Sequence, residues 1–302
     1  MMRLIAVLLF GLPRFAVADS YDVCVYGGNA SGVMAACAAA KEGAKVIVVE
    51  PSRWLGGMTG GGLMHIDWGR EEAVSGSTRP ILKKDYNDAQ YRAVFTEMLK
   101  SAGVTVLFEH RVSAVEKSAG AIRAITLDLA PFDATGCPPA TPTKAGARVI
   151  AAKVFIDCSY EGDLMARSGV AYTFGREAKS TYGESLAGSQ PPMSVYAIDP
   201  YVKAGDPQSG LLPGLQSTPV APVGEADKLT MGYGFRWRFV FKGESLPIEP
   251  PANYDPKQFE LYRRAFQQGV DILSGRVMRG KVDGWEVSGG RVYSGGAGTL
   301  AR

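Results

Sequence analysis

The sequence has few of the side chains that metal and thiol-based redox sites use: among its 302 residues are two histidines and four cysteines. Cys24, Cys37, Cys137 and Cys158 form no CxxC pair and match no zinc spacing. We therefore expect no metal site, and the absence of a CxxC pair excludes a disulfide reductase of that type. Cys24 and Cys37 fall in apolar stretches and are expected to act as small buried hydrophobes.

The chain also lacks a large excess of charge. Its formal net charge is +3, which is too small to indicate nucleic acid or a charged membrane surface as a partner. Hydrophobic residues make up 46% of the sequence, and the length is sufficient for a sizeable core. We expect a small-molecule substrate as the partner, and the sequence does not specify an oligomeric state.

Long apolar runs are missing after the N-terminus, so no transmembrane segment is expected there. Residues 1–18 combine Arg3, the apolar run Leu4–Leu12 and the small residues Ala16-Val17-Ala18. This pattern is typical of a secretory signal peptide, and the run is too short to span a bilayer. The sequence thus predicts an exported protein, periplasmic or secreted. An apolar N-terminus without that role, or a misplaced start codon, is the alternative.

Apolar periodicity predicts a strand, a helix and a strand at residues 22–27, 31–42 and 45–50. Units of this length form a right-handed βαβ crossover with a parallel sheet. Further along the chain the pattern predicts a second amphipathic helix and more strands, at residues 88–102, 104–108, 112–116, 121–129 and 148–157. The segment between the last two strands, residues 131–147, is rich in Pro, Thr and Gly and is expected to be an exposed loop. Beyond residue 168 the periodicity indicates only a strand-like stretch at 230–241 and a helix at 256–270.

The turn after the first strand is glycine-rich. It reads Gly27-Gly28-Asn29-Ala30-Ser31-Gly32, so it keeps the first and third glycines of a GxGxxG fingerprint and has Asn29 at the middle one. Asparagine can take the place of the middle glycine because it tolerates unusual backbone angles better than most residues. Glu50 ends the second strand, 23 positions after Gly27, where a carboxylate would meet an adenosine ribose. These features predict a dinucleotide site and disfavour a 2′-phosphate, although a glycine-rich turn in an unrelated α/β sheet is the alternative.

A second glycine cluster follows the second strand. Residues 55–63 read Leu-Gly-Gly-Met-Thr-Gly-Gly-Gly-Leu. Such a loop lets backbone amides approach a flat ring or a phosphate closely. A nicotinamide-binding domain has no need of it, so the cluster favours a flavin.

Residues 22–63, with Tyr-Gly-Gly-x-x-x-Gly, Val-Glu-Pro and Leu-Gly-Gly-Met-Thr, resemble the secreted or membrane-associated FAD-dependent oxidoreductases of the glutathione-reductase fold type. Residues 104–112, 155–163 and 176–188 resemble further segments of that family. The resemblance implies a Rossmann-like FAD-binding domain at 19–167 and a β-rich substrate-side region at 168–302.

The resemblance also implies which residues hold FAD. Glu50 would bind the ribose, Val112 would offer its backbone to the adenine, and Gly56, Gly57 and Met58 would lie toward the flavin. The full set of expected cofactor-binding residues is Gly27, Gly28, Asn29, Ser31, Gly32, Glu50, Pro51, Arg53, Gly56, Gly57, Met58, Thr59, Val112, Asp157, Cys158, Ser159, Gly162 and Asp163. Catalytic residues are not specified, with His65 and Asp67 as candidates because they follow the glycine loop.

Proteins of the family that this chain resembles return to the FAD domain near the C-terminus through a strand that ends in Gly-Asp or a similar motif, and residues 270–302 contain no such motif. The expectation is a C-terminally truncated FAD-dependent oxidoreductase that passes a hydride from a small organic substrate to the flavin. An inactive fragment or binding module is one alternative, and an NAD(P)-dependent reductase is another.

Overall fold

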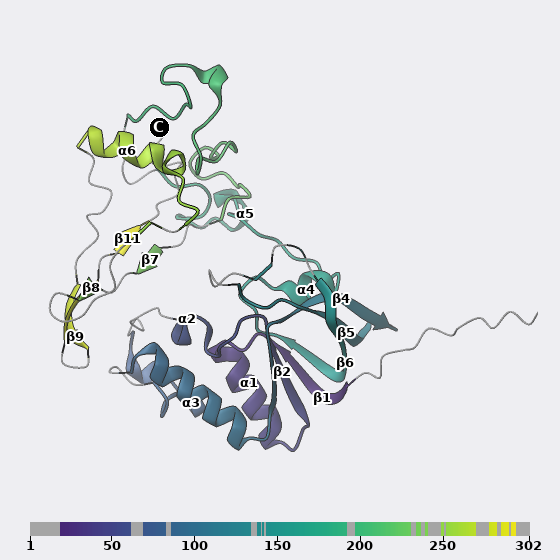
Figure 1. The fold of residues 1–302 in the computed structure, drawn as a ribbon. Helices are drawn as coiled ribbons and strands as arrows, with labels where there is room; N and C mark the ends of the chain where they lie inside the picture. Colours follow the sequence, from purple (N-terminus) through teal and green to yellow (C-terminus); the bar gives the residue numbers. More distant parts are fainter. Residues whose placement is uncertain are drawn as a thin grey trace, which may run out of the picture. The chain divides into compact units, whose positions relative to one another are not determined.

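The computed structural model describes residues 19–61, 69–82, 86–133, 138–139, 141, 143–191, 197–230, 234–236, 239–240, 249–250, 252–269, 278–282, 285–289 and 291–293. The chain divides into two compact units, residues 1–172 and residues 173–302 (Figure 1). Among the described residues, the first unit has one sheet and two apolar clusters, and the second has two sheets and one apolar cluster.

The first unit is built on a six-stranded sheet with the strand order β3-β2-β1-β6-β5-β4. Strands β1, β2, β3 and β6 run parallel, and β5 pairs antiparallel with both of its neighbours. The strands are β1 (Asp19–Tyr26), β2 (Val46–Glu50), β3 (Thr105–Phe108), β4 (His110–Ser118), β5 (Ala121–Leu129) and β6 (Thr143–Asp157).

Strand β6 joins the parallel and antiparallel parts of this sheet. Its first half pairs with β5, whereas its second half pairs with β1 from Asp19 opposite Ile150 to Tyr26 opposite Asp157. Strands β1 and β6 therefore end side by side. Because Tyr26 also pairs with Val49 of β2, the loops that follow these three strands leave the sheet at one edge.

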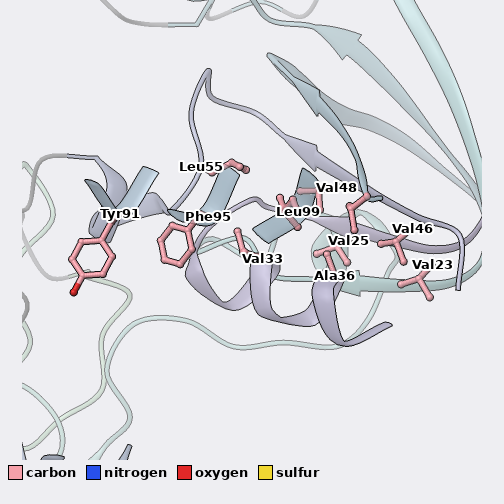
Figure 2. Close-up of a cluster of buried hydrophobic side chains, with 11 residues drawn as sticks. Val23, Val25, Val33, Ala36, Val46, Val48, Leu55, Tyr91, Phe95 and Leu99 are labelled. Carbon is pink, nitrogen blue, oxygen red and sulfur yellow. The ribbon is translucent and has the colours of Figure 1, made fainter. Parts of the chain in front are cut away.

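Helices α1 (Ala30–Lys41) and α3 (Asp88–Ser101) cover one face of the parallel strands. Alternate residues of β1 and β2 point toward them, because successive side chains of a strand face opposite sides. Figure 2 shows the resulting layer of buried side chains, which comprises Val23, Val25, Val33, Ala36, Val46, Val48, Leu55, Tyr91, Phe95 and Leu99, with Val104 completing the cluster.

The opposite face of β1 and β2 packs against the antiparallel strands and the short helix α4 (Asp163–Arg167). The buried side chains here are Cys24, Tyr26, Ile47, Val49, Val112, Ile125, Leu127, Ile150 and Leu164. The first unit is completed by the helical turns α2 (Gly57–Gly60), η1 (Glu71–Ala73) and η2 (Gly76–Thr78).

Among its described residues, the second unit contains less regular structure than the first. Its helices are α5 (Lys179–Tyr182), η3 (Pro207–Ser209), η4 (Pro256–Phe259) and α6 (Glu260–Gln267). Its strands are β7 (Gly234–Arg236), β8 (Phe239–Val240), β9 (Met278–Val282), β10 (Trp285–Gly289) and β11 (Arg291–Tyr293), which form the sheets β8-β10-β9 and β11-β7. The buried apolar residues that cluster here are Ile198, Leu212, Leu261 and Ala265.

The α/β fold class and the βαβ unit are confirmed, and β5 has the predicted bounds. Two local predictions were wrong. Strand β6 starts at Thr143, inside the segment expected to be a loop, because Thr143 pairs with Leu129 and extends the ladder with β5. The second glycine cluster includes a single helical turn, α2, and is not loop throughout. Among the helices that the structure describes, none combines the length and apolar character needed to cross a bilayer.

Candidate dinucleotide site

Three loops converge at the carboxyl edge of the parallel strands. They are the turn after β1 (residues 27–29), the segment after β2 (residues 51–56) and the segment after β6 (residues 158–162). The amide of Gly27 donates to Val49 O at 2.8 Å, and the amide of Cys158 donates to Tyr26 O at 2.7 Å. These bonds continue the sheet ladder past the strand ends and fix the three loops against one another. In open α/β sheets, ligands bind at this edge.

Gly27 makes the first turn possible. Its φ is +100°, a left-handed value that side chains other than glycine rarely adopt. A Cβ atom at this position would lie 2.8 Å from Ser159 N and 2.9 Å from Cys158 C, so there is no room for one. The turn after β1 therefore fits tightly under the loop after β6.

Asn29 is the N-cap of α1. Its side-chain oxygen accepts the amide of Gly32 at 3.0 Å and the hydroxyl of Ser31 at 2.8 Å. Its side-chain nitrogen donates to Cys158 O. The backbone of Asn29 has φ −69° and ψ −178°, which is ordinary extended geometry. The predicted reason for asparagine here, tolerance of unusual backbone angles, was therefore wrong: Asn29 caps the helix and ties it to the loop after β6.

Glu50 lies at the end of β2 and is 9% exposed. One of its carboxylate oxygens accepts the amide of Gly28, and the other accepts the amide of Ser52 at 2.7 Å. A carboxylate has about four lone-pair positions. Glu50 thus holds the turns after β1 and β2 together and keeps acceptor capacity for two ribose hydroxyls.

The second glycine cluster lies directly against the first. The amide of Gly56 donates to Gly28 O at 2.8 Å, and Asn29 and Gly56 form an isolated parallel bridge. Helix α2 then begins at Gly57 and places Met58 and Thr59 in its single turn. The structure therefore brings the two predicted glycine clusters together.

The loop after β6 is organised by Asp157. One carboxylate oxygen of Asp157 accepts the amide of Ser159 at 2.9 Å and its hydroxyl at 2.7 Å, and the other accepts the amide of Met165 at 2.8 Å. The Ser159 hydroxyl oxygen in turn accepts the amide of Asp163 at 3.1 Å. Gly162, with φ +70°, precedes α4 as its N-cap. These contacts shape the loop, so the side chains of Asp157 and Ser159 position backbone around the site.

Of the remaining predicted cofactor residues, Pro51 and Arg53 lie in the segment after β2, and Val112 lies on β4. Val112 is buried on β4, and its amide donates to the Tyr26 hydroxyl at 3.2 Å. Pro51 and Arg53 follow Glu50, and the Arg53 guanidinium carbon lies 5.1 Å from the centre of the Phe132 ring. The candidate catalytic residues His65 and Asp67 lie outside the described residues.

The thiols near the site have raised pKa values. Burial raises the pKa of Cys24 to about 12, which keeps this core thiol protonated at neutral pH. Burial also raises the pKa of the half-buried Cys158, against a smaller opposing effect of a hydrogen bond with Ser31. Over the part of the chain that the structure covers, no group of three or more His, Cys, Asp or Glu side chains is placed to hold a metal ion.

The arrangement fits an adenine dinucleotide. The first amides of a helix have no partner within the helix, and the positive end of the α1 dipole lies at Asn29. A pyrophosphate is the kind of group that such an end binds, and the buried Glu50 carboxylate lies at the tip of the neighbouring strand for the ribose. Fold and site together define a dinucleotide-binding protein of the Rossmann-like class.

Comparison with known proteins supplies the family. The model of the FAD dependent oxidoreductase family matches residues 22–290. The chain belongs to this family of oxidoreductases, whose cofactor is FAD, and the prediction from the two glycine clusters is confirmed.

A curated relative, vinyl phenol reductase from Lactiplantibacillus plantarum, is 37% identical over 79 residues, which cover 25% of this chain and 16% of the relative. The chain thus matches about one sixth of that protein's length. Among solved structures, a geranylgeranyl bacteriochlorophyll reductase-like protein from Thermoplasma acidophilum has a TM-score of 0.34 and 16% identity. The match covers 51% of this chain and 43% of that protein. L-proline dehydrogenase from P. horikoshii has a TM-score of 0.36 and 12% identity, and the match covers 53% of this chain and 59% of that protein.

Proposed function

We propose that the protein is an oxidoreductase in which FAD, bound at the site of the first unit, accepts a hydride from a small organic substrate. The observation that carries this proposal is the pairing of the α1 N-terminus with the Glu50 carboxylate across the Gly27–Asn29 turn, within a chain of the FAD dependent oxidoreductase family. The bound flavin supplies the redox chemistry, so the chain itself has to bind, orient and shield it.

Residues of the first unit divide this work. The amides at the start of α1 hold the pyrophosphate, and Glu50 holds the adenosine ribose, as the buried carboxylate and the helix dipole favour. The second glycine cluster, next along the chain and bonded to Gly28 through Gly56, leads toward the flavin. His65 and Asp67 follow it and stay our candidates for proton transfer.

Residues 168–302 form the substrate-side region in this proposal. The relative that matches a quarter of this chain is named vinyl phenol reductase. We therefore propose to test phenolic and vinyl compounds first. The panel should include oxidisable alcohols and amines as well as reducible alkenes, since the direction of hydride transfer is part of what is tested.

Residues 1–18 act as a secretory signal in this proposal, and the protein works outside the cytoplasm. N-terminal sequencing of the protein recovered from the periplasm or medium tests this. A start at Asp19 supports export, whereas a protein retained in the cytoplasm with Met1 in place contradicts it.

Identification of the bound cofactor tests the proposed function. The purified protein should show a flavin absorbance band at about 450 nm, and acid should release FAD. Release of a nicotinamide nucleotide alone would favour the NAD(P)-dependent reductase. Bound FAD that no alcohol or amine of the panel reduces, and that no alkene of the panel reoxidises after chemical reduction, would favour an inactive binding module.

A further inference from the structure

Tyr160 joins the loop after β6 to the second glycine cluster. Its hydroxyl oxygen accepts the amide of Met58 at 2.9 Å, a contact between residues 102 positions apart. The Asp157 carboxylate accepts hydrogen bonds from the amide and the hydroxyl of Ser159, the residue before Tyr160. These bonds fix the backbone from which Tyr160 projects. The hydroxyl is therefore held in place from outside the glycine cluster.

Helix α2 depends on this contact because it has no cap of its own. Its N-cap residue is Gly56, whose missing side chain offers no hydrogen bond to the first amides of the turn. Met58 is the second residue of the turn, so its amide has no partner within the helix. The Tyr160 hydroxyl fulfils the role that a serine or aspartate side chain at the N-cap would otherwise have.

The packing around Gly57 shows how closely the parts meet. Gly57 has φ +52°, and an added Cβ would lie 2.7 Å from the Cβ of Asn29 and would overlap the Tyr160 hydroxyl. Asn29 is the N-cap of α1. The start of α1, the start of α2 and the Tyr160 hydroxyl thus meet at one point, beside the helix end to which the pyrophosphate is assigned.

The structure assigns Tyr160 a positioning role: its hydroxyl holds the Gly57–Met58 turn against the start of α1, so that the second glycine cluster is preformed for FAD. This inference rests on the proposed use of the site. Tyr160 is 57% exposed, so its ring adds little to the core and its role lies in the hydroxyl.

The test is Tyr160→Phe, which keeps the ring and removes the hydrogen-bond acceptor. The matched control is Tyr172→Phe, at a tyrosine that is 58% exposed in the same unit. FAD is titrated into cofactor-free protein and its Kd is measured from flavin fluorescence. Amide exchange of residues 56–61 is measured without FAD. One hydrogen bond predicts about a fivefold weaker Kd and about fivefold faster exchange for Tyr160→Phe, and no change for the control.

The outcomes are separable. If wild type binds FAD and Tyr160→Phe binds it equally well, the positioning role is overturned while the proposed function stands. If wild type itself binds no FAD, the proposed function fails, and this inference fails with it. Faster exchange of residues 56–61 in the FAD-free variant, together with a weaker Kd, supports the role independently of any turnover.

Discussion

The two units of the chain are stabilised in different ways. In the first, strands β1 and β2 are buried on both faces between two apolar clusters. In the second, the apolar cluster is small, and polar contacts join distant residues: Arg264 bonds the carbonyls of Asp199 and Tyr201 at 2.9 and 2.8 Å, and Arg176 pairs with Asp227. Apolar periodicity therefore predicts the first unit well, whereas the partner of an arginine cannot be read from spacing.

The largest effect among these substitutions is expected at Gly27, where the turn after β1 packs against the loop after β6. Gly27→Ala adds a Cβ 2.8 Å from Ser159 N at a residue with φ +100°. Left-handed strain and overpacking each cost about 1–3 kcal/mol, so FAD affinity should fall by about 100-fold or more. The Kd for FAD and the thermal midpoint of unfolding measure it.

Gly43→Ala is the control for this substitution. Gly43 has φ +85° and nothing within 4 Å of an added Cβ, so it shares the strain without the crowding. It should lose about 1 kcal/mol of stability and keep its affinity for FAD. Equal loss of FAD affinity in both variants would mean that backbone strain alone, and not the fit of the turn under the loop after β6, governs binding.

A smaller effect is expected at Glu50. Glu50→Gln keeps the size of the side chain but removes the charge that strengthens hydrogen bonds to ribose hydroxyls, and FAD affinity should fall about 10-fold. Asp22→Asn is the control, because Asp22 also accepts an amide from a neighbouring segment, that of Lys45 at 2.8 Å. Asp22 lies beside the start of β2, whereas Glu50 lies at its end. FAD titration of both variants tests the assignment, which an unchanged Kd in Glu50→Gln would refute.

The smallest effect is expected in the second unit. The Arg176 guanidinium bonds both carboxylate oxygens of Asp227 and lowers the pKa of Asp227 to about 2. Arg176→Lys removes the bidentate hydrogen bonding to Asp227. It should speed proteolysis of residues 173–230 about threefold at neutral pH, with FAD affinity unchanged. Arg123→Lys, at an exposed arginine of β5, is the control.

The pH dependence of this difference follows from the sign of the shift. Asp227 has a folded pKa below its ordinary value of 3.8, so its pairing stabilises the fold fully above about pH 4 and is lost as the pH falls through about 2. Cleavage by pepsin at pH 2 should therefore show little difference between Arg176→Lys and wild type. A difference that persists at pH 2 would assign the effect of the substitution to something other than this ion pair.

The sequence predicts those parts of the fold whose residues have a regular apolar pattern. Strands β1 and β2 consist largely of β-branched and apolar residues, and α3 has regularly spaced apolar side chains, so local pattern was sufficient. The start of β6 at Thr143 was missed, because a segment rich in Pro, Thr and Gly has turn composition and joins the sheet only through its pairing with β5.

The site was predictable where it depends on spacing and not where it depends on tertiary contact. Glu50 and Gly56 both bond Gly28, as expected from their places at and after the ends of neighbouring strands. Asn29 as a helix cap was available from the sequence, since asparagine directly before an alanine-rich helix is a capping signal. The contact of Tyr160 with Met58 was not, because no local pattern relates residues 102 positions apart.

The comparison of FAD with FMN tests the central claim most directly, because FMN has the flavin and one phosphate and lacks the adenosine monophosphate half. The claim is that the α1 N-terminus holds the pyrophosphate and that Glu50 holds the adenosine ribose. Titration of cofactor-free protein with each compound should give a Kd for FAD at least about 100-fold lower than for FMN, the equivalent of about 3 kcal/mol in hydrogen bonds and charge. Equal affinities for FAD and FMN would contradict the account.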